Sequence, residues 1–311
     1  HTVFTNANHR HTPFFKFGIR PRKGTGLTGA ARGVVLWIKI NHSFFAFEIF
    51  KAYHIAVLVG HQQGYQVGAI VSDGGGDGTL NEVVTGIVGC PNVAVTMFCG
   101  GSGNDFVKIF NDPKAFFDLE RLLDCEETEF DLIRVNDRIS LNICSVGLDA
   151  RIGTDVASYK RIPLLSGFRA YAVSTVVNIV RGIAEHYVVT IGDETIDGEM
   201  TMICVCNGRF YGGGFNPVPE ADPADGILDV LLVDKVTRLQ VPGVIGKYKN
   251  GRYKELPQLV RHIRTDSLQI LCDKQTSANV DGELLTAQTV NIRVAEEKLR
   301  FFYPKGLTWN T

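Results

Sequence analysis

The first half of the chain alternates between short apolar runs and segments rich in glycine or polar residues. Runs at 34–38, 67–71 and 93–98 have the length and composition of buried strands. The last two are each followed by a glycine-rich loop, at 74–79 and 100–105. Strand and glycine loop therefore occur twice in succession.

Helical periodicity follows the first of these loops. Apolar residues recur from Leu80 to Ile87 at the spacing of one helix face, so a helix is expected to begin at Thr79. Thr79 and Glu82 have the spacing of a capping box at its N-terminus. A second helix is expected from Pro113 to 123. Strand, glycine loop and helix in this order are typical of an α/β domain with a parallel sheet.

The pattern of apolar and polar residues changes after about residue 125. Apolar and polar residues alternate on both sides of Asn136-Asp137 and again around 192–194, which predicts two β-hairpins. A helix is expected near 168–183. Further strands are expected at 187–191, 196–207, 227–233, 268–271, 276–280, 289–294 and 299–303. The second half therefore reads as mostly antiparallel β-structure, in a domain separate from 1–125.

Composition fits this division and narrows the class of protein. A chain of 311 residues favours two domains, and 45% apolar and 21% charged residues are typical of a soluble globular protein. The formal net charge of -1 argues against a nucleic-acid partner. Seven scattered cysteines without a CxxC pair indicate reduced thiols in the cytoplasm. No apolar run reaches the ~18 residues of a membrane span.

Charge is unevenly distributed along the chain. Residues 1–72 contain eight Lys or Arg and one acidic residue, Glu48. A basic, aromatic segment of this kind suits contact with anionic lipid headgroups. A transit-peptide-like composition and an ordinary domain half with a solvated basic face remain alternatives.

The loop at 74–79 (Gly-Gly-Gly-Asp-Gly-Thr) has the composition of a phosphate site. N–H groups at a helix N-terminus attract anions, and glycines let phosphate oxygens approach the backbone. Asp77 would be repelled by bare phosphate, so its presence indicates a Mg²⁺ ion between them. The alternative is a tight turn in which Asp77 only caps the helix.

Three further polar clusters follow in the chain, at 101–105, 222–226 and 281–283. The first again lies between a strand and an apolar segment. Asp281-Gly282 is also an ordinary hairpin turn, and a loop carboxylate such as Asp225 is commonly part of an Asx turn. Each cluster is weak evidence when it is taken alone.

Together and in this order, the clusters resemble the diacylglycerol kinase catalytic family, which includes YegS-like lipid kinases and sphingosine kinases. The resemblance runs from 67 to about 303, through the segments 75–86, 101–106, 142–150, 207–226 and 281–283. It implies an α/β nucleotide domain akin to phosphofructokinase and NAD kinase (1–125) and a C-terminal β-sandwich (126–295). It also implies a site in the cleft between them and a tail, 296–311, that returns to the first domain.

The resemblance implies roles for individual residues, with ATP and Mg²⁺ as cofactors. Asp77 would help to hold Mg²⁺, Asp105 and Asp131 match acidic active-site positions, and Glu283 matches the general base. Asp225, with the carbonyl groups of Asp222 and Ile227, matches a structural metal site. The implied nucleotide-binding residues are Gly75, Gly76, Gly78, Thr79, Asn81, Glu82, Gly101, Ser102 and Asn104.

The N-terminal part departs from the family pattern. The family opens with an Asn-Pro-x-Ser-Gly loop, and the nearest segment here is 20–24 (Arg-Pro-Arg-Lys-Gly). Residues 24–29 fit G-x-G-x-x-G, but Glu48 is the only acidic residue that could bind a ribose and it follows no clear strand end, so NAD(P) binding is not favoured. Two smaller departures are Thr85 and Ser102.

The sequence therefore predicts an ATP-dependent lipid kinase that works from a membrane surface. An NAD kinase-like enzyme and a catalytically silent lipid-binding protein are the alternatives. Diacylglycerol, phosphatidylglycerol and sphingoid bases remain open as acceptors, with pocket residues expected near 162–168 and 210–215. The sequence leaves open whether two copies form a homodimer.

Overall fold

The structure is a computed structural model of the whole chain. It describes residues 76–89, 93–101, 103–159, 174, 177–178 and 182–309, and the backbone of the strands at 18–21, 33–40, 43–50, 55–62 and 65–72. Within this range the chain forms two compact units. Unit 1 comprises 1–129 and 299–309, and unit 2 comprises 130–298.

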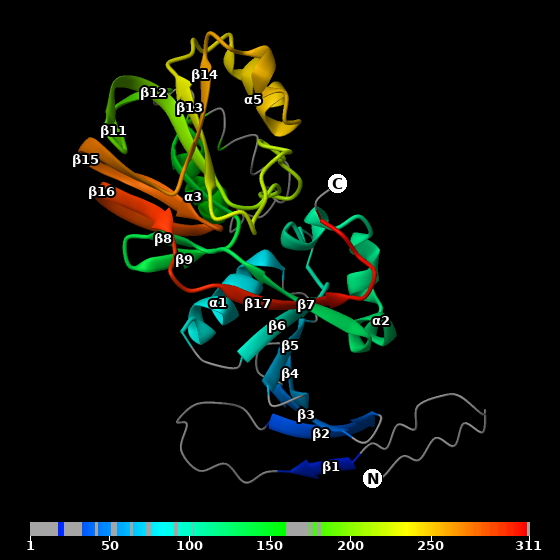
Figure 1. The fold of residues 1–311 in the computed structure, drawn as a ribbon. Helices are drawn as coiled ribbons and strands as arrows, with labels where there is room; N and C mark the ends of the chain where they lie inside the picture. The colour runs from blue at the N-terminus through cyan, green and yellow to red at the C-terminus, as the bar shows by residue number, and fades with distance from the viewer. Residues whose placement is uncertain are drawn as a thin grey trace. The chain divides into compact units, whose positions relative to one another are not determined.

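Unit 1 contains one sheet, in the order β1-β2-β3-β4-β5-β6-β17-β7 among the described residues. Its central strands are parallel: β6 (Val93–Phe98) pairs with β5 (Tyr65–Ser72) on one side and with β17 (Leu299–Pro304) on the other. The α/β class with a parallel sheet is thus confirmed around the glycine loops. β7 (Cys125–Phe130) lies at the far edge, beside β17 (Figure 1).

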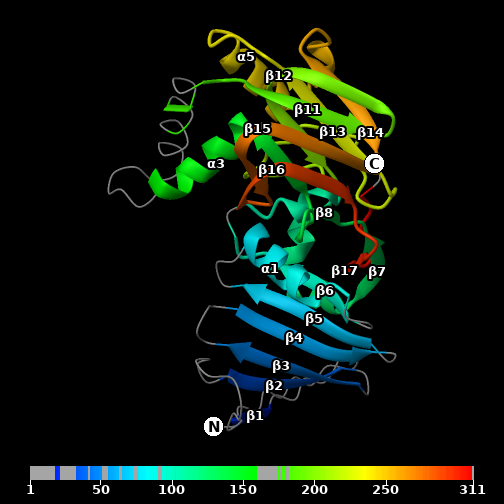
Figure 2. The same ribbon diagram turned by 90° about the vertical axis from the view of Figure 1, so that its left-hand side faces the viewer.

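The parallel pairing does not extend to the N-terminal strands. Figure 2 shows β2 to β5 side by side, and each pairs antiparallel with the next. The predicted strand at 34–38 lies within this meander. The strands before β5 are β1 (Gly18–Pro21), β2 (Gly33–Ile40), β3 (Ser43–Phe50) and β4 (Ile55–Gln62).

Helix α1 (Asp77–Ile87) connects β5 to β6 and buries Leu80 and Val84. It begins two residues earlier than predicted, with Gly76 at the N-cap and no side-chain cap. The predicted capping box is therefore wrong, because Thr79 lies inside the helix and not at its N-cap. The helix predicted from Pro113 is divided into two short elements, η2 (Pro113–Phe117) and α2 (Leu119–Leu123), because Asp118 adopts an extended backbone and caps the second one.

Unit 2 is built around an antiparallel sheet. Its strand order is β14-β13-β12-β10-β15-β16-β8-β9, with β11 paired to β12 and β15. The strands are β8 (Ile133–Val135), β9 (Arg138–Ser140), β10 (Ile143–Gly147), β11 (Glu185–Ile191), β12 (Glu194–Cys206), β13 (Leu228–Asp234), β14 (Val260–Thr265), β15 (Ser267–Val280) and β16 (Glu283–Val294). Helices α3 (Leu148–Tyr159) and α5 (Val241–Lys249) and the turn η3 (Tyr253–Glu255) complete it.

Two apolar clusters lie on the two faces of strands β10, β12 and β13. In β12, Ile203 and Val205 belong to the first cluster, which also contains residues of β11, β15 and β16. Cys204 and Cys206 point to the opposite face and pack with α3 and α5. These strands are therefore buried on both faces, which explains why β13 is continuously apolar instead of alternating. The predicted β-sandwich class is confirmed.

The hairpin turns of unit 2 follow the predicted sequence signals. Asn136 and Gly192 have positive φ angles of 52° and 56°, and each lies in a two-residue turn between paired strands. Of the helix predicted at 168–183, most residues lie outside the described ones, but Ser174, Val177 and Asn178 are helical. Among the described residues, no helix is long and apolar enough to cross a membrane.

Candidate functional site

The N-terminus of α1 forms one wall of the candidate phosphate site. Gly76 is the N-cap, and its carbonyl accepts a hydrogen bond from Leu80 N at 3.2 Å. No side-chain hydrogen bond caps the helix at its N-cap, Gly76. This helix end therefore retains donors and a positive dipole for an anion.

The second glycine loop lies directly against the first. Asn104, with a φ of 50°, accepts a hydrogen bond from Gly101 N at 3.1 Å and donates one to Gly101 O at 2.7 Å. A Cβ on Gly101 would lie 2.4 Å from the Cα of Gly76, which is closer than any side chain allows. Glycine at 101 is therefore required for the two loops to meet backbone to backbone.

Two carboxylates converge beside Gly103. Asp77 Oδ1 accepts a hydrogen bond from Phe106 N at 3.0 Å. A Cβ on Gly103 would lie 2.7 Å from Asp77 Oδ2 and 3.6 Å from Asp105 Oδ2, so both oxygens face the same point. Asp105 is buried and forms an ion pair with Lys108 at 2.5 Å.

The surroundings of Asp77 disfavour its charge. Burial raises its pKa above the ordinary value, the negative charge of Asp105 raises it further, and the hydrogen bond from Phe106 opposes both effects. Burial, with a contribution from the charge of Asp77, also raises the pKa of the neighbouring Cys99 thiol to about 12. A cation at this position would relieve the repulsion between the carboxylates.

These residues fit a Mg²⁺ ion bound to a nucleotide. Mg²⁺ prefers carboxylate oxygens and commonly takes one or two of them together with substrate phosphates. Asp77 Oδ2 and Asp105 Oδ2 supply such oxygens next to a helix N-terminus that can bind the phosphates. The arrangement therefore suits a metal–phosphate complex better than bare phosphate.

The last strand of the chain, β17, packs against residues that follow the second glycine loop. The Phe106 ring packs edge-to-face on Phe301 of β17, with centroids 5.1 Å apart. Phe110 stacks on Tyr303 and contacts Trp309. The backbone N–H that holds Asp77 therefore belongs to a residue anchored by the returning segment 299–309.

Asp131 of unit 2 is held by an ion pair and by backbone hydrogen bonds. Its carboxylate is buried and accepts hydrogen bonds from Lys298 Nζ at 2.6 Å and Gly226 N at 2.7 Å. Asn207 donates to Asp131 O at 2.8 Å and to Leu141 O at 2.7 Å. Asp131 thus joins the first and last segments of unit 2 and the loop that contains Gly226.

The cluster 281–283 forms the β15–β16 hairpin turn. Asp281 and Gly282 have φ angles of 49° and 97°, as a two-residue turn of the predicted kind requires. The partly buried Asp281 carboxylate accepts hydrogen bonds from the backbone N–H groups of Leu141, Asn142 and Ile143. This fixes the turn, and Glu283 is exposed as the first residue of β16.

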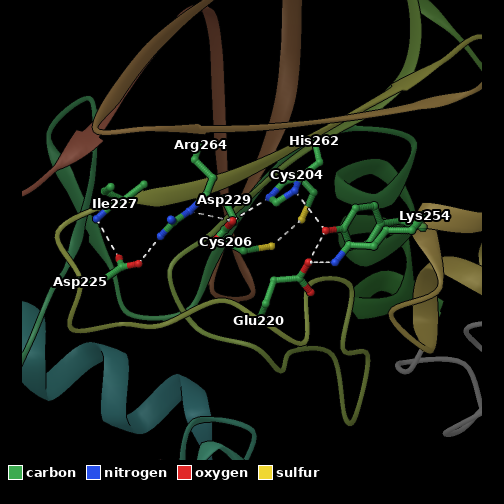
Figure 3. A network of polar contacts seen from close by, with 10 residues as sticks. Cys204, Cys206, Glu220, Asp225, Ile227, Asp229, Lys254, His262 and Arg264 are labelled. Carbon is green, nitrogen blue, oxygen red and sulfur yellow. Dashed lines mark hydrogen bonds and ion pairs between the residues drawn. The ribbon is translucent and has the colours of Figure 1, made fainter. Parts of the chain in front are cut away.

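The donor set implied for a structural metal is arranged differently. Asp225 Oδ1 accepts a hydrogen bond from Ile227 N at 3.0 Å, and Oδ2 forms an ion pair with Arg264 (Figure 3). The Asp222 carbonyl accepts a hydrogen bond from Asp225 N at 3.4 Å. As arranged, these residues do not fit a cation.

The remaining predicted residues differ in their surroundings. Gly75 and Ser102 lie outside the described residues. Gly78 and Glu82 are exposed on α1, Thr79 is half-buried, and Asn81 is buried and accepts a hydrogen bond from Thr85 at 3.5 Å. The predicted pocket segment 162–168 is also outside the described residues, whereas Tyr211 and Phe215 pack on the α5 side of unit 2.

The sequence analysis missed the cations that pair with the acidic residues. These are Lys108 beside Asp105, Lys298 beside Asp131 and Arg264 beside Asp225. Lys108 follows Asp105 by three residues, a spacing that could have indicated the pair. Lys298 lies 167 residues from Asp131, and no local signal connects them.

Comparison with known proteins identifies the class. Residues 42–135 match the model of the diacylglycerol kinase catalytic domain, which includes both glycine loops. Residues 142–303, more than half of the chain, match the YegS C-terminal NAD kinase beta sandwich-like domain. The chain therefore combines the two domains that these family models describe, in that order.

The chain belongs to the diacylglycerol kinase-like family of lipid kinases. It is 26% identical over 231 residues to a protein of Staphylococcus carnosus (74% of this chain, 75% of that one), and 27% identical over 222 residues to one of Staphylococcus aureus strain Mu3 (71% and 72%). Both carry the name "Putative lipid kinase". The crystal structure of a diacylglycerol kinase from Bacillus anthracis has the same fold, with a TM-score of 0.55, 17% identity and coverage of 75% of this chain and 76% of that one.

Proposed function

We propose that this protein transfers the γ-phosphate of ATP to the hydroxyl group of a diacylglycerol-like lipid. The observation that carries the proposal is the edge of unit 1. There two glycine loops meet at an uncapped helix N-terminus, and Asp77 and Asp105 converge beside Gly103. Phosphoryl transfer depends mostly on positioning and charge neutralisation, and these groups are suited to both tasks.

In this proposal the backbone N–H groups at the start of α1 hold the phosphates. Asp77 and Asp105 hold Mg²⁺, which, when bound, neutralises the charge that develops on the phosphates. The hydrogen bond from Phe106 N orients Asp77 so that its Oδ2 is left to bind the metal. Lys108 keeps the second carboxylate, that of Asp105, in place.

Glu283 is the proposed general base. It is an exposed carboxylate at the tip of the β15–β16 hairpin, and none of the ion pairs of the described residues includes it. An attacking hydroxyl group must lose its proton to a base within hydrogen-bond reach. The turn anchored by Asp281 gives Glu283 a defined position from which to accept that proton.

A lipid acceptor is supported by the names of the relatives and by the two family models. The lipid tail would remain in or near a bilayer, so we propose that the protein works at a membrane surface. Diacylglycerol is the first candidate, because the catalytic-domain model that matches is that of diacylglycerol kinases.

The test is transfer of labelled γ-phosphate by the purified chain in the presence of Mg²⁺. Mixed micelles should contain diacylglycerol, phosphatidylglycerol or sphingosine in parallel, and NAD should be offered as a soluble acceptor. We expect labelled lipid to form, fastest with diacylglycerol, and NAD to remain unlabelled. Labelled NADP without labelled lipid, or no labelled product at all, would refute the proposal.

A further inference from the structure

The loop 222–227 of unit 2 is largely organised by its own backbone. Asp222 Oδ1 accepts a hydrogen bond from Ala224 N at 3.0 Å, and Asp225 Oδ1 accepts one from Ile227 N. Gly226, with a φ of 75°, donates its N–H to Asp131. Asp225 Oδ1, a candidate ligand for a cation at this loop, is thus engaged by the backbone of the loop.

Three carboxylates nevertheless lie close together here, so the loop needs a positive charge. Asp222 and Asp225 lie in the loop, and Asp229 follows two residues after it, in β13. Asp229, on β13, has a side chain that is only 2% exposed. An unpaired buried carboxylate is strongly unfavourable.

Arg264 supplies that charge. It lies on β14 directly across from Asp229, as its register partner. Its Nη2 forms an ion pair with Asp225 Oδ2, and its Nε lies 3.5 Å from Asp229 Oδ1 (Figure 3). One guanidinium group therefore bridges a loop carboxylate and a buried strand carboxylate.

A second set of contacts holds the N-terminal end of the segment 220–227. His262, two residues before Arg264, contacts Asp229 Oδ1 at 2.6 Å and the Tyr253 hydroxyl at 3.0 Å. Tyr253 donates a hydrogen bond to Glu220, which also pairs with Lys254 at 2.6 Å. Side chains of residues 253–264 thus hold both ends of the segment 220–227.

We propose that Arg264 replaces a bound cation at this loop. Its guanidinium group neutralises Asp225 and Asp229 and fixes the segment 220–227, so that no divalent ion binds there. A divalent cation on Asp225 would have to displace Arg264 from the carboxylate, and it would be repelled by the guanidinium charge if both stayed. The proposal is independent of the proposed kinase activity.

The test compares thermal unfolding of the full chain, without nucleotide, in EDTA and in millimolar MgCl₂ or CaCl₂. Asp225→Asn is the key variant, because Mg²⁺ bound at Asp77 stabilises both proteins equally. We expect the wild type and Asp225→Asn to show the same cation-dependent shift of the midpoint. A larger shift in the wild type would reveal a cation bound through Asp225 and would overturn the proposal.

Arg264 itself is tested by two substitutions. Arg264→Gln removes the charge and is expected to lower the midpoint by several degrees in EDTA. Arg264→Lys retains a cation and should recover part of this loss. An unchanged midpoint of Arg264→Gln in EDTA would contradict the proposal. If Arg264→Gln does not fold, the comparison of wild type with Asp225→Asn still decides.

Discussion

Two acidic regions of the molecule differ in what neutralises them. At the α1 edge of unit 1, Asp77 is partly buried beside the carboxylate of Asp105, and the ion pairs of the described residues include none to Asp77. In the loop 222–229 of unit 2, Arg264 pairs with both Asp225 and Asp229. Among the described residues no ion pair offsets the repulsion at Asp77, whereas Arg264 offsets part of it at Asp225.

This difference distinguishes a candidate ligand-binding site, at Asp77, from a group of ion pairs that holds the fold together, at Asp225. A carboxylate left beside a like charge, at a helix end that attracts phosphate, is in the state expected of a metal–nucleotide site. Asp225 and Asp229 are instead held by a guanidinium group that a cation would have to displace. Acidic residues in a family motif can therefore serve either purpose, and their neighbours decide which.

The largest expected effect is that of Asp77→Asn on phosphate transfer. We expect the rate to fall by at least about 10³-fold, because the charge that holds the metal is removed while the hydrogen bond from Phe106 can be kept. The measurement is labelled-phosphate transfer to lipid at saturating ATP. Glu120→Gln, at an exposed position of α2 in the same unit, is the control and should retain full activity. Equal losses of transfer rate in Asp77→Asn and in the control would show that the effect is not specific to the Asp77 carboxylate.

Glu283 extends the comparison to a carboxylate outside both regions. Glu283→Gln is expected to lower the turnover number by about 10²–10³-fold with little change in the KM for ATP, since a general base acts on the acceptor hydroxyl. Glu194→Gln is the matched control, because Glu194 is also exposed and opens a strand after a two-residue turn. Near-normal turnover of purified Glu283→Gln would exclude it as the base.

Lys298→Met tests a second ion pair of unit 2, that between Lys298 and Asp131. It leaves the buried Asp131 carboxylate without its cation, so we expect a loss of about 3 kcal/mol in the free energy of unfolding, measured with urea. Lys235→Met is the control: Lys235 pairs with Glu199 at 2.6 Å, but both side chains are more than half exposed. Its expected loss is about 0–1 kcal/mol. A small effect of Lys298→Met would show that Asp131 does not depend on this pair.

The smallest expected effect is a dependence of stability on pH at Asp77. Its pKa in the folded chain is raised above 3.8, so the stability associated with the neutral carboxyl is present below that pH and is lost as the pH rises through the raised pKa. Without metal, Asp77→Asn should therefore gain stability relative to the wild type over this interval. Unfolding at a series of pH values in EDTA measures the gain. A difference in stability between the two proteins that does not change with pH would contradict the raised pKa of Asp77.

Much of the local structure could be predicted from the sequence. Glycine loops after apolar runs identified the strands β5 and β6, because the need for close backbone approach is expressed in residue type. The turns at Asn136, Gly192 and Asp281-Gly282 were equally readable, since residues that tolerate positive φ are few.

The features that could not be predicted depend on contacts between residues far apart in the sequence, which no local sequence pattern indicates. The start of α1 was placed at Thr79, but Gly76 is the N-cap, because the approach of Gly101 and the hydrogen bond to Asp77 outweigh the capping signal. Arg264 and Asp225 are 39 residues apart and meet only through the pairing of β13 with β14. The antiparallel order of β1 to β5 was likewise not predictable from mixed periodicity.

Binding of ATP by the wild type and Asp77→Asn, in Mg²⁺ and in EDTA, tests the central claim most directly. Titration calorimetry should find that Mg²⁺ increases the affinity of the wild-type chain for ATP and that Asp77→Asn loses this increase. The account predicts no such loss for Asp225→Asn, since Arg264 already neutralises that carboxylate. If Asp77→Asn binds Mg·ATP as tightly as the wild type does, the edge of unit 1 is not the metal–nucleotide site.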